Sequence, residues 1–306
     1  MDEKPRPTTL WTELLGEPFA VTYTDVDGVR TRTLEAGSGP EVLLLHGRGG
    51  HLENWSRNIV PLSRRFRVVA LDMLGHGYTA KPSVEYTIGN YAAHVLAFLR
   101  ARRLDRVSII GQSLGGWVAA WLAQEEPQRI EKLVLLNTNG FCVIPPEIVE
   151  KIRQSSRAAV ESPTPDSVRR RFQPLFLDAS LIPEELVRIR LDIYRQAEMK
   201  DAMERIVGSE LEPANQRKFE LTPELLRGIT ASTFVMWSRH DPLLPWQEAQ
   251  RYQKALPNSR FHLLEGCAHW PQYENPQEFN RVVSEFLLKA ESADARPPDR
   301  TVRMEA

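Results

Sequence analysis

Ser113 stands in a setting typical of a catalytic nucleophile. Glycines occupy positions 111 and 115, two residues before and two residues after the serine. An apolar run at 107–110 precedes this stretch and a helical pattern at 117–123 follows it, which predicts a strand, a tight turn and a helix. The glycines allow neighbouring backbone to approach closely, so the hydroxyl can be held outward on a strained turn. A purely structural glycine-rich turn is the alternative if no base and acid follow.

A base and an acid do follow in the sequence. A serine hydroxyl is a weak nucleophile at neutral pH, so it needs a base within hydrogen-bond reach and a third group that orients the base. Asp241 follows one apolar run and His269 follows the next, so we expect both on loops at the same sheet edge as Ser113. We predict a Ser113, Asp241, His269 triad. The alternatives are a helix cap for Asp241 and a buried structural role for His269.

Acyl transfer also requires donors for the oxyanion. Preorganised backbone N–H groups stabilise the tetrahedral intermediate by roughly 3 to 4 kcal/mol for each donor. We predict the N–H groups of Leu114 and Arg48 as these donors, with Gly47 bordering the substrate. Arg48 suits this role if its side chain turns away, because only main-chain atoms are used. The glycine-rich stretch 46–50 lacks the Lys-Ser/Thr ending of a nucleotide-binding loop.

The elements that must position these residues follow an α/β pattern. Residues 19–23 and 29–34 alternate loosely around Asp27 and Gly28, which predicts an antiparallel hairpin at a sheet edge. Continuous apolar runs predict parallel strands that are covered by helices on both faces. These runs lie at 42–45, 68–71, 107–110, 233–236 and 260–264, and helical stretches lie at 55–64 and 88–102. We expect a mostly parallel sheet of eight strands.

The region 141–227 has no comparable strand and is rich in charge and proline. Amphipathic patterns such as residues 183–191 predict a helical cap inserted between the sixth and seventh strands, over the strand ends where α/β folds bind ligands. The basic run 169–171 is interpreted as a solvated helix face. The predicted domains are a first core part at 1–140, the cap at 141–227, a second core part at 228–291 and a disordered tail at 292–306.

Composition excludes several classes of partner. The 306 residues include 39 basic and 40 acidic side chains, so no global field favours nucleic acid or an anionic membrane. Cys142 and Cys267 are too few for a disulfide framework, which favours a reducing cytoplasm. The start of the sequence is charged and contains proline, and the sequence has no long apolar run. We therefore expect a protein that is not secreted and does not span a membrane. We expect a small-molecule substrate, and the sequence leaves self-association open.

No metal site is predicted. His46 begins the turn after a core strand and is interpreted as architectural. The other histidines outside the triad have no second ligand at metal-binding spacing, so they are interpreted as structural. These are His51, His76, His94, His240 and His262.

Several segments carry a more specific signature. Residues 268–274 place Trp270 directly after His269 and continue through a Gln-Tyr-Glu step to the Glu-Phe-Asn-Arg run at 278–281. Residues 72–82, and the cap segments 176–178 and 181–186 that lead to Arg190, add two further signatures. On these segments, residues 42–290 resemble an α/β-hydrolase and in particular the meta-cleavage product hydrolases. That family splits carbon-carbon bonds in ring-fission products of aromatic catabolism.

The resemblance implies roles for individual residues. Arg190 would bind the substrate carboxylate from the cap, because a guanidinium binds a carboxylate bidentately, and Trp270 would pack beside the reacting dienoate. Gln112 stands where the family has Asn near the oxo-acid end of the substrate. Phe141 and Phe176 are apolar and would contact the 6-substituent, for which an aryl and an alkyl group are both expected alternatives. The sequence also departs from the family in having Arg48 and no proline in its oxyanion loop, and Ala268 before the histidine.

These inferences combine into one leading hypothesis. The chain is expected to hydrolyse a carbon-carbon bond in a 2-hydroxy-6-oxohexa-2,4-dienoate through an acyl-serine intermediate, without a cofactor. A carboxylesterase or lactonase that uses the same triad is the alternative enzyme. A ligand receptor that keeps a hydrolase fold is the alternative from another class.

Overall fold

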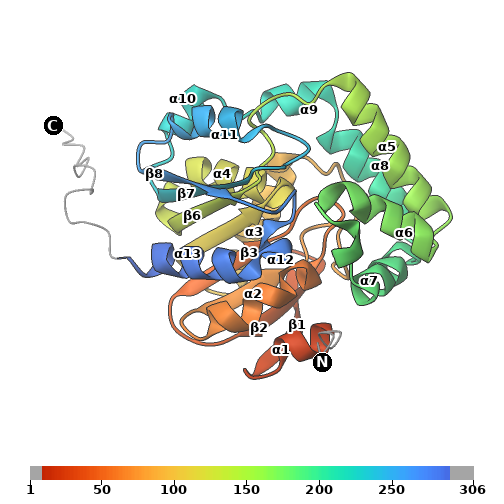
Figure 1. Cartoon of the computed structure of the whole chain (residues 1–306), viewed down its shortest axis with the longest axis horizontal. Helices are drawn as coiled ribbons and strands as arrows, with labels where there is room; N and C mark the ends of the chain where they lie inside the picture. The colour runs from red at the N-terminus through yellow and green to blue at the C-terminus, as the bar shows by residue number, and fades with distance from the viewer. Residues whose placement is uncertain (1–8, 290–306) are drawn as a thin grey trace, which may run out of the picture.

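The computed structural model, in which residues 9–289 are described, is built on one eight-stranded sheet (Figure 1). The spatial order of the strands is β1-β2-β4-β3-β5-β6-β7-β8. Strand β2 pairs antiparallel with both β1 and β4, and the other neighbouring strands pair parallel. The predicted edge hairpin and mostly parallel sheet are confirmed. The strands are β1 (Phe19–Val26), β2 (Val29–Ala36), β3 (Glu41–Leu45), β4 (Arg67–Leu71), β5 (Val107–Gln112), β6 (Ile130–Leu136), β7 (Ser232–Ser238) and β8 (Ser259–Leu264).

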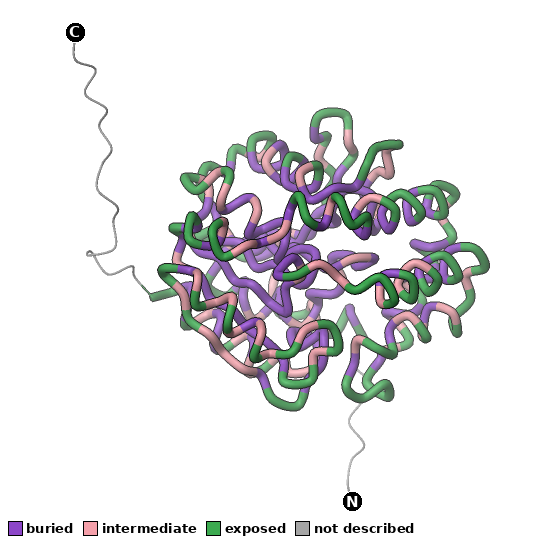
Figure 2. Tube along the Cα trace, turned by 90° about the horizontal axis from the view of Figure 1, so that it is seen from above, coloured by how far each residue is buried: buried purple, intermediate pink, exposed green. Residues whose placement is uncertain are grey.

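Helices cover both faces of the sheet because successive strand residues point to opposite sides. Leu43 and Leu45 of β3 join an apolar cluster with α3, α4 and α11, whereas Val42 and Leu44 join a second cluster with α2 and α13. Figure 2 shows the buried strands inside an exposed outer layer of helix surface. These helices are α2 (Ser56–Ser63), α3 (Ile88–Ala101), α4 (Leu114–Glu125), α11 (Trp246–Gln253) and α13 (Pro276–Leu288). The remaining core elements are α1 (Leu10–Leu14), α12 (Pro271–Glu274), η1 (Leu52–Trp55) and η2 (Pro127–Arg129).

The chain between β6 and β7 is helical, as the sequence predicts. Figure 1 shows α5 to α8 gathered beside the sheet, and their apolar side chains form a cluster of their own together with Trp270. The inserted elements are α5 (Pro146–Glu161), α6 (Pro165–Phe172), η3 (Gln173–Leu175), η4 (Ala179–Leu181), α7 (Glu184–Tyr194), α8 (Met199–Glu210), α9 (Pro213–Lys218) and α10 (Pro223–Arg227). We refer to them as the cap helices.

The exact division into core and cap at 140/141 and 227/228 stays a prediction. The expected disordered tail at 292–306 lies outside the described residues. Within residues 9–289, no helix has both the length and the apolar character that crossing a membrane requires.

Ser113 sits on the strained turn that the sequence predicts. It lies between β5 and α4 with φ 55° and ψ −116°, a conformation that non-glycine residues rarely adopt. A Cβ at Gly115 would lie 2.3 Å from the carbonyl oxygen of Leu45, and a Cβ at Gly111 would lie 2.4 Å from the carbonyl oxygen of Gly115. The turn therefore packs backbone against backbone, and glycine is required at both positions.

Replacing Gly115 with alanine is expected to lower the free energy of unfolding by roughly 3 kcal/mol or more, because rigid backbone atoms must move. Gly208→Ala is the matched control: it lies inside α8 with nothing within 4 Å of the added Cβ. Alanine there should raise stability by about 0.5 to 1 kcal/mol, because it favours the helix. Urea denaturation of both variants measures the difference, and equal stability of the two would contradict the packing described here.

Candidate active site

Asp241 and His269 form the close pair that the sequence predicts. The Nδ1–H of His269 donates to Oδ2 of Asp241 at 2.5 Å, and the two side chains are only 4% and 1% exposed. The other oxygen, Oδ1, accepts the backbone N–H groups of Leu243 at 2.9 Å and Leu244 at 3.0 Å. These bonds hold Asp241 in place. A proton on Nδ1 leaves Nε2 of His269 as a lone-pair acceptor, the form that a general base requires.

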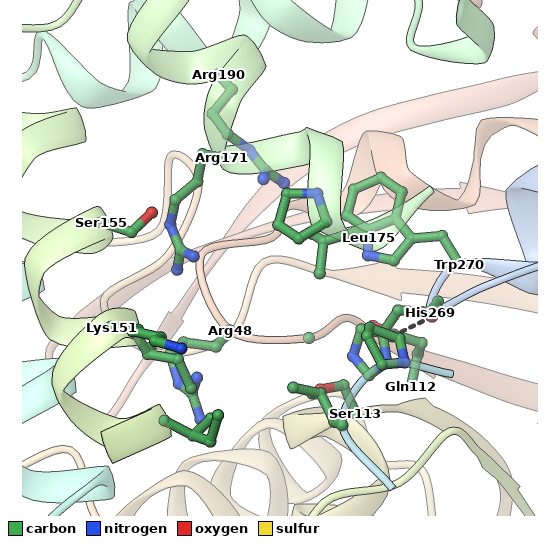
Figure 3. A pocket seen from close by; sticks show the side chains of 16 residues that line it. Arg48, Gln112, Ser113, Lys151, Ser155, Arg171, Leu175, Arg190, His269 and Trp270 are labelled. Carbon is green, nitrogen blue, oxygen red and sulfur yellow. Dashed lines mark hydrogen bonds between the residues drawn. The ribbon is translucent and has the colours of Figure 1, made fainter. Parts of the chain in front are cut away.

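Ser113 and His269 both line one pocket of about 280 Å³, together with residues of the cap helices (Figure 3). Among residues 9–289, the His269 ring is hydrogen-bonded to Asp241 and not to Ser113. The structure thus brings all three predicted residues together and leaves the last bond unformed. Catalytic hydrogen bonds are often long in unliganded enzymes and shorten when substrate binds.

The side chain of Gln112 holds the main chain of His269, the candidate base. Its Nε2 donates to the carbonyl oxygen of His269 at 3.0 Å, shown as the dashed line in Figure 3. The backbone N–H of His269 donates to the carbonyl oxygen of Leu175 in the cap, also at 3.0 Å. Oε1 of Gln112 is buried without a partner among the described residues, and a Cβ at Gly47 would lie 2.5 Å from it. Both Gln112 and Gly47 line the pocket, as expected.

The predicted oxyanion loop is held at its start by hydrogen bonds of His46. His46 Nδ1 donates to the carbonyl oxygen of Gly47 at 2.8 Å, and its Nε2 accepts the N–H of Met73 at 3.1 Å. Burial lowers the pKa of His46 to about 3, so the ring is neutral and serves the loop rather than proton transfer. The N–H of Leu114 lies in the first turn of α4, where the helix supplies no partner for it.

The side chain of Arg48 extends toward α8 and away from the Ser113 turn. Its predicted role as a backbone N–H donor requires this orientation. Its Nε donates to Oε2 of Glu210 at 2.7 Å and its second terminal nitrogen donates to Oε1 at 2.5 Å. Glu210 belongs to α8, and the side chains are 8% and 0% exposed. Burial opposes the charge on Arg48, and Glu210 outweighs this effect and raises the pKa of the guanidinium. A cap helix therefore holds the oxyanion loop.

Arg190 is a buried cation without a carboxylate partner in the described part of the chain. It is 1% exposed, and its Nε and one terminal nitrogen make no hydrogen bond there. The guanidinium carbon lies 4.1 Å from the ring centroid of Phe172 and 5.5 Å from that of Trp270. Burial lowers its pKa to about 10, so Arg190 stays charged at neutral pH. Arg190 and Trp270 both line the pocket.

Two aromatic residues predicted to contact the substrate do not line the pocket. Phe141 is 1% exposed and its ring stacks on Tyr252 at 5.0 Å, within the apolar cluster of the core. Phe176 packs behind Trp270, with ring centroids 5.5 Å apart. The expectation of substrate contact for Phe141 and Phe176 is corrected accordingly.

Sequence reasoning missed two cations in the pocket. Arg171 was interpreted as part of a solvated helix face, yet it lines the pocket beside Lys151 of α5. The signal was present in the helical period: Arg171 lies three residues after Val168 and next to Phe172, both fully buried. Within residues 9–289, no group of three or more His, Cys, Asp or Glu side chains is arranged to hold a metal ion.

Glu210→Gln is expected to lower kcat about tenfold and the free energy of unfolding by about 3 kcal/mol. The change leaves the charge of Arg48 buried without its counterion and loosens the loop that carries an oxyanion donor. The matched control is Glu204→Gln on the same helix, whose partner Arg157 is half exposed, so less than about 1 kcal/mol should be lost. Ester hydrolysis and urea denaturation measure both effects. A wild-type kcat in the Glu210→Gln variant would show that Glu210 does not contribute to the position of the oxyanion donor.

Comparison with known proteins places this geometry in a family. The model of the alpha/beta hydrolase fold matches residues 40–276. A 2-hydroxy-6-oxo-6-(2'-aminophenyl)hexa-2,4-dienoic acid hydrolase of Metapseudomonas resinovorans is 31% identical over 272 residues, covering 87% of this chain and 90% of the relative. A 2-hydroxy-6-oxononadienedioate/2-hydroxy-6-oxononatrienedioate hydrolase of Paraburkholderia xenovorans is 33% identical, covering 83% of this chain and 89% of the relative.

Solved structures agree with these relatives. The meta-cleavage product hydrolase of Pseudomonas fluorescens superposes with a TM-score of 0.74 at 26% identity, covering 87% of this chain and 97% of that protein. Fold, sequence and the order of the candidate triad along the chain point the same way. The chain therefore belongs to the α/β-hydrolase family, among the meta-cleavage product hydrolases.

Proposed function

We propose that this protein hydrolyses a carbon-carbon bond in a 2-hydroxy-6-oxohexa-2,4-dienoate through an acyl-serine intermediate. Its relatives are named for this class of substrate, which supports the choice. Ser113, His269 and Asp241 are assigned as nucleophile, base and orienting acid, and the N–H groups of Leu114 and Arg48 as oxyanion donors. A small-molecule substrate is the only partner that the proposal requires.

The observation that carries the proposal is the buried, unpaired guanidinium of Arg190 in the same pocket as Ser113. An isolated charge in a protein interior costs free energy unless a counterion or ligand compensates it. A substrate carboxylate supplies that compensation, and a simple ester does not. Because Phe172 and Trp270 flank the guanidinium, its position is fixed before substrate arrives.

In the proposed mechanism, the dienol is first ketonised in the pocket while Arg190 holds its carboxylate. His269 Nε2 takes the proton of Ser113, and Oγ attacks the 6-oxo carbon. The bond between carbons 5 and 6 then breaks, and its electron pair is delocalised through the adjacent alkene onto the 2-oxo oxygen. That oxygen takes the proton held by His269, and the fragment leaves as a 2-hydroxydienoate. Water activated by His269 cleaves the acyl-serine ester and releases the second acid.

We place the reaction in the cytoplasm as part of this proposal. Cys142 and Cys267 are both free thiols, and Cys267 is buried beside Ser238. The two cysteines form no disulfide, which suits a reducing compartment.

Ser113→Ala is expected to lower kcat by a factor on the order of 10³ to 10⁶, because the attacking oxygen is removed. Loss of absorbance of a yellow dienoate measures the rate. The variant should still bind the dienoate, because Arg190 is untouched, and its thermal unfolding should match the wild type. Turnover near the wild-type rate would exclude Ser113 as the nucleophile.

Arg190→Gln distinguishes carbon-carbon hydrolysis from esterase or lactonase activity. The variant should lose about 100-fold in kcat/KM for a dienoate, because a charge-assisted, bidentate contact is lost. Hydrolysis of nitrophenyl acetate, which has no carboxylate, should stay within about threefold.

Arg188→Gln is the matched control, because Arg188 lies on the same helix with its side chain exposed. It should change neither rate. If Arg190→Gln lowered kcat/KM equally for the dienoate and the ester, Arg190 would not be the residue that binds the carboxylate. A wild-type enzyme that cleaves esters and leaves every dienoate intact would establish the esterase alternative.

A further inference from the structure

The pocket contains more positive charge than one substrate carboxylate requires. Four cations line it, Arg48, Lys151, Arg171 and Arg190, and no acidic side chain does. Glu210 engages both carboxylate oxygens with Arg48, so that charge is balanced. Arg190 is assigned to the carboxylate of the dienoate. Arg171 and Lys151 form no ion pair within the part of the chain described here; Arg171 has a buried guanidinium nitrogen without a partner, and Lys151 is exposed at the edge of the pocket.

Arg171 points into the pocket from α6. Its Nε is buried and makes no hydrogen bond among the described residues. Figure 3 shows its guanidinium turned toward Lys151 and Ser155, whereas that of Arg190 lies toward Leu175 and Trp270. Both guanidiniums border the side chain of Tyr194, and from there they point to different parts of the pocket. A single carboxylate on Arg190 leaves the region around Arg171 without an anion.

The face of α5 that borders this region has a matching composition. Ile148, Lys151, Ile152 and Ser155 all line the pocket, at spacings that place them on one side of a helix. The isoleucines suit an apolar spacer, and Lys151 and Ser155 are donors for an anion at its end. Leu243, beside the triad aspartate, adds a further apolar surface to the pocket.

We propose that Arg171 and Lys151 form a second anion subsite, which binds a carboxylate at the end of the substrate's 6-substituent. The preferred substrate is then a dioic acid, with one carboxylate on Arg190, the reacting 6-oxo carbon at Ser113 and an apolar spacer along α5. This inference rests on the proposed function and narrows it to one class of dienoate. A substrate with an uncharged aryl or alkyl group leaves the buried guanidinium nitrogen of Arg171 without an anion.

The test compares two dienoates of equal length, whose 6-substituents end in a carboxylate and in a primary carboxamide. The wild type should show a kcat/KM at least about 30-fold higher for the acid. Arg171→Gln should lower kcat/KM for the acid about 10- to 100-fold and leave the amide within about threefold, since only the acid loses a charge-assisted contact. Lys151→Gln should act in the same direction. Arg170→Gln, an exposed neighbour on the same helix, is the control and should change neither rate.

A second readout is independent of carbon-carbon cleavage. Nonanedioate should inhibit nitrophenyl acetate hydrolysis more strongly than nonanoate, and Arg171→Gln should abolish the difference. Equal cleavage of acid and amide, with no effect of Arg171→Gln, would overturn the subsite and leave the proposed function intact. Inhibition by nonanedioate that depends on Arg171, in an enzyme that cleaves no dienoate, would support the subsite and overturn the proposed function.

Discussion

Direct contact between two backbone segments sets the geometry of the whole site. The turn that carries Ser113 rests against the end of β3, where the carbonyl oxygen of Leu45 leaves no room for a side chain at Gly115. The predicted oxyanion loop begins at His46, the residue that follows this strand. Nucleophile and oxyanion donors therefore have their separation fixed by main-chain packing, which does not adjust as side-chain rotamers do. Such fixed dipoles stabilise a developing charge without reorganisation during the reaction.

The cap helices add a second layer of positioning. The carbonyl oxygen of Leu175 accepts the N–H of His269, and Glu210 holds Arg48. The first contact fixes the base and the second fixes the oxyanion loop, so the cap does more than cover the pocket. It also supplies Arg190 and Arg171, the two pocket arginines that we propose bind carboxylates. Substrate recognition and the placement of catalytic groups thus depend on the same helices.

The sequence predicted features that local patterns determine. Buried strands appear as apolar runs, and a glycine-flanked serine between strand and helix predicts the strained turn, with φ 55° at Ser113. The expectations for Phe141, Phe176 and Arg171 failed for a shared reason. Nearness to the pocket depends on how the cap helices rotate and pack, and proximity along the chain does not determine this. Gln112 illustrates the same limit, since its bond to the main chain of His269 joins residues 157 positions apart.

The unbalanced charge of the pocket also affects how a ligand arrives. The chain as a whole carries a formal net charge of −1, so it offers no long-range attraction to anions. The guanidiniums of Arg171 and Arg190 have no carboxylate partner within residues 9–289, and with the exposed Lys151 they create a local positive potential that extends about a Debye length, roughly 8 Å at physiological ionic strength. Such a potential would attract the anionic substrate that we propose and orient it at the mouth of the pocket. Ionic strength thus becomes a control on the rate of encounter, separate from the chemistry at Ser113.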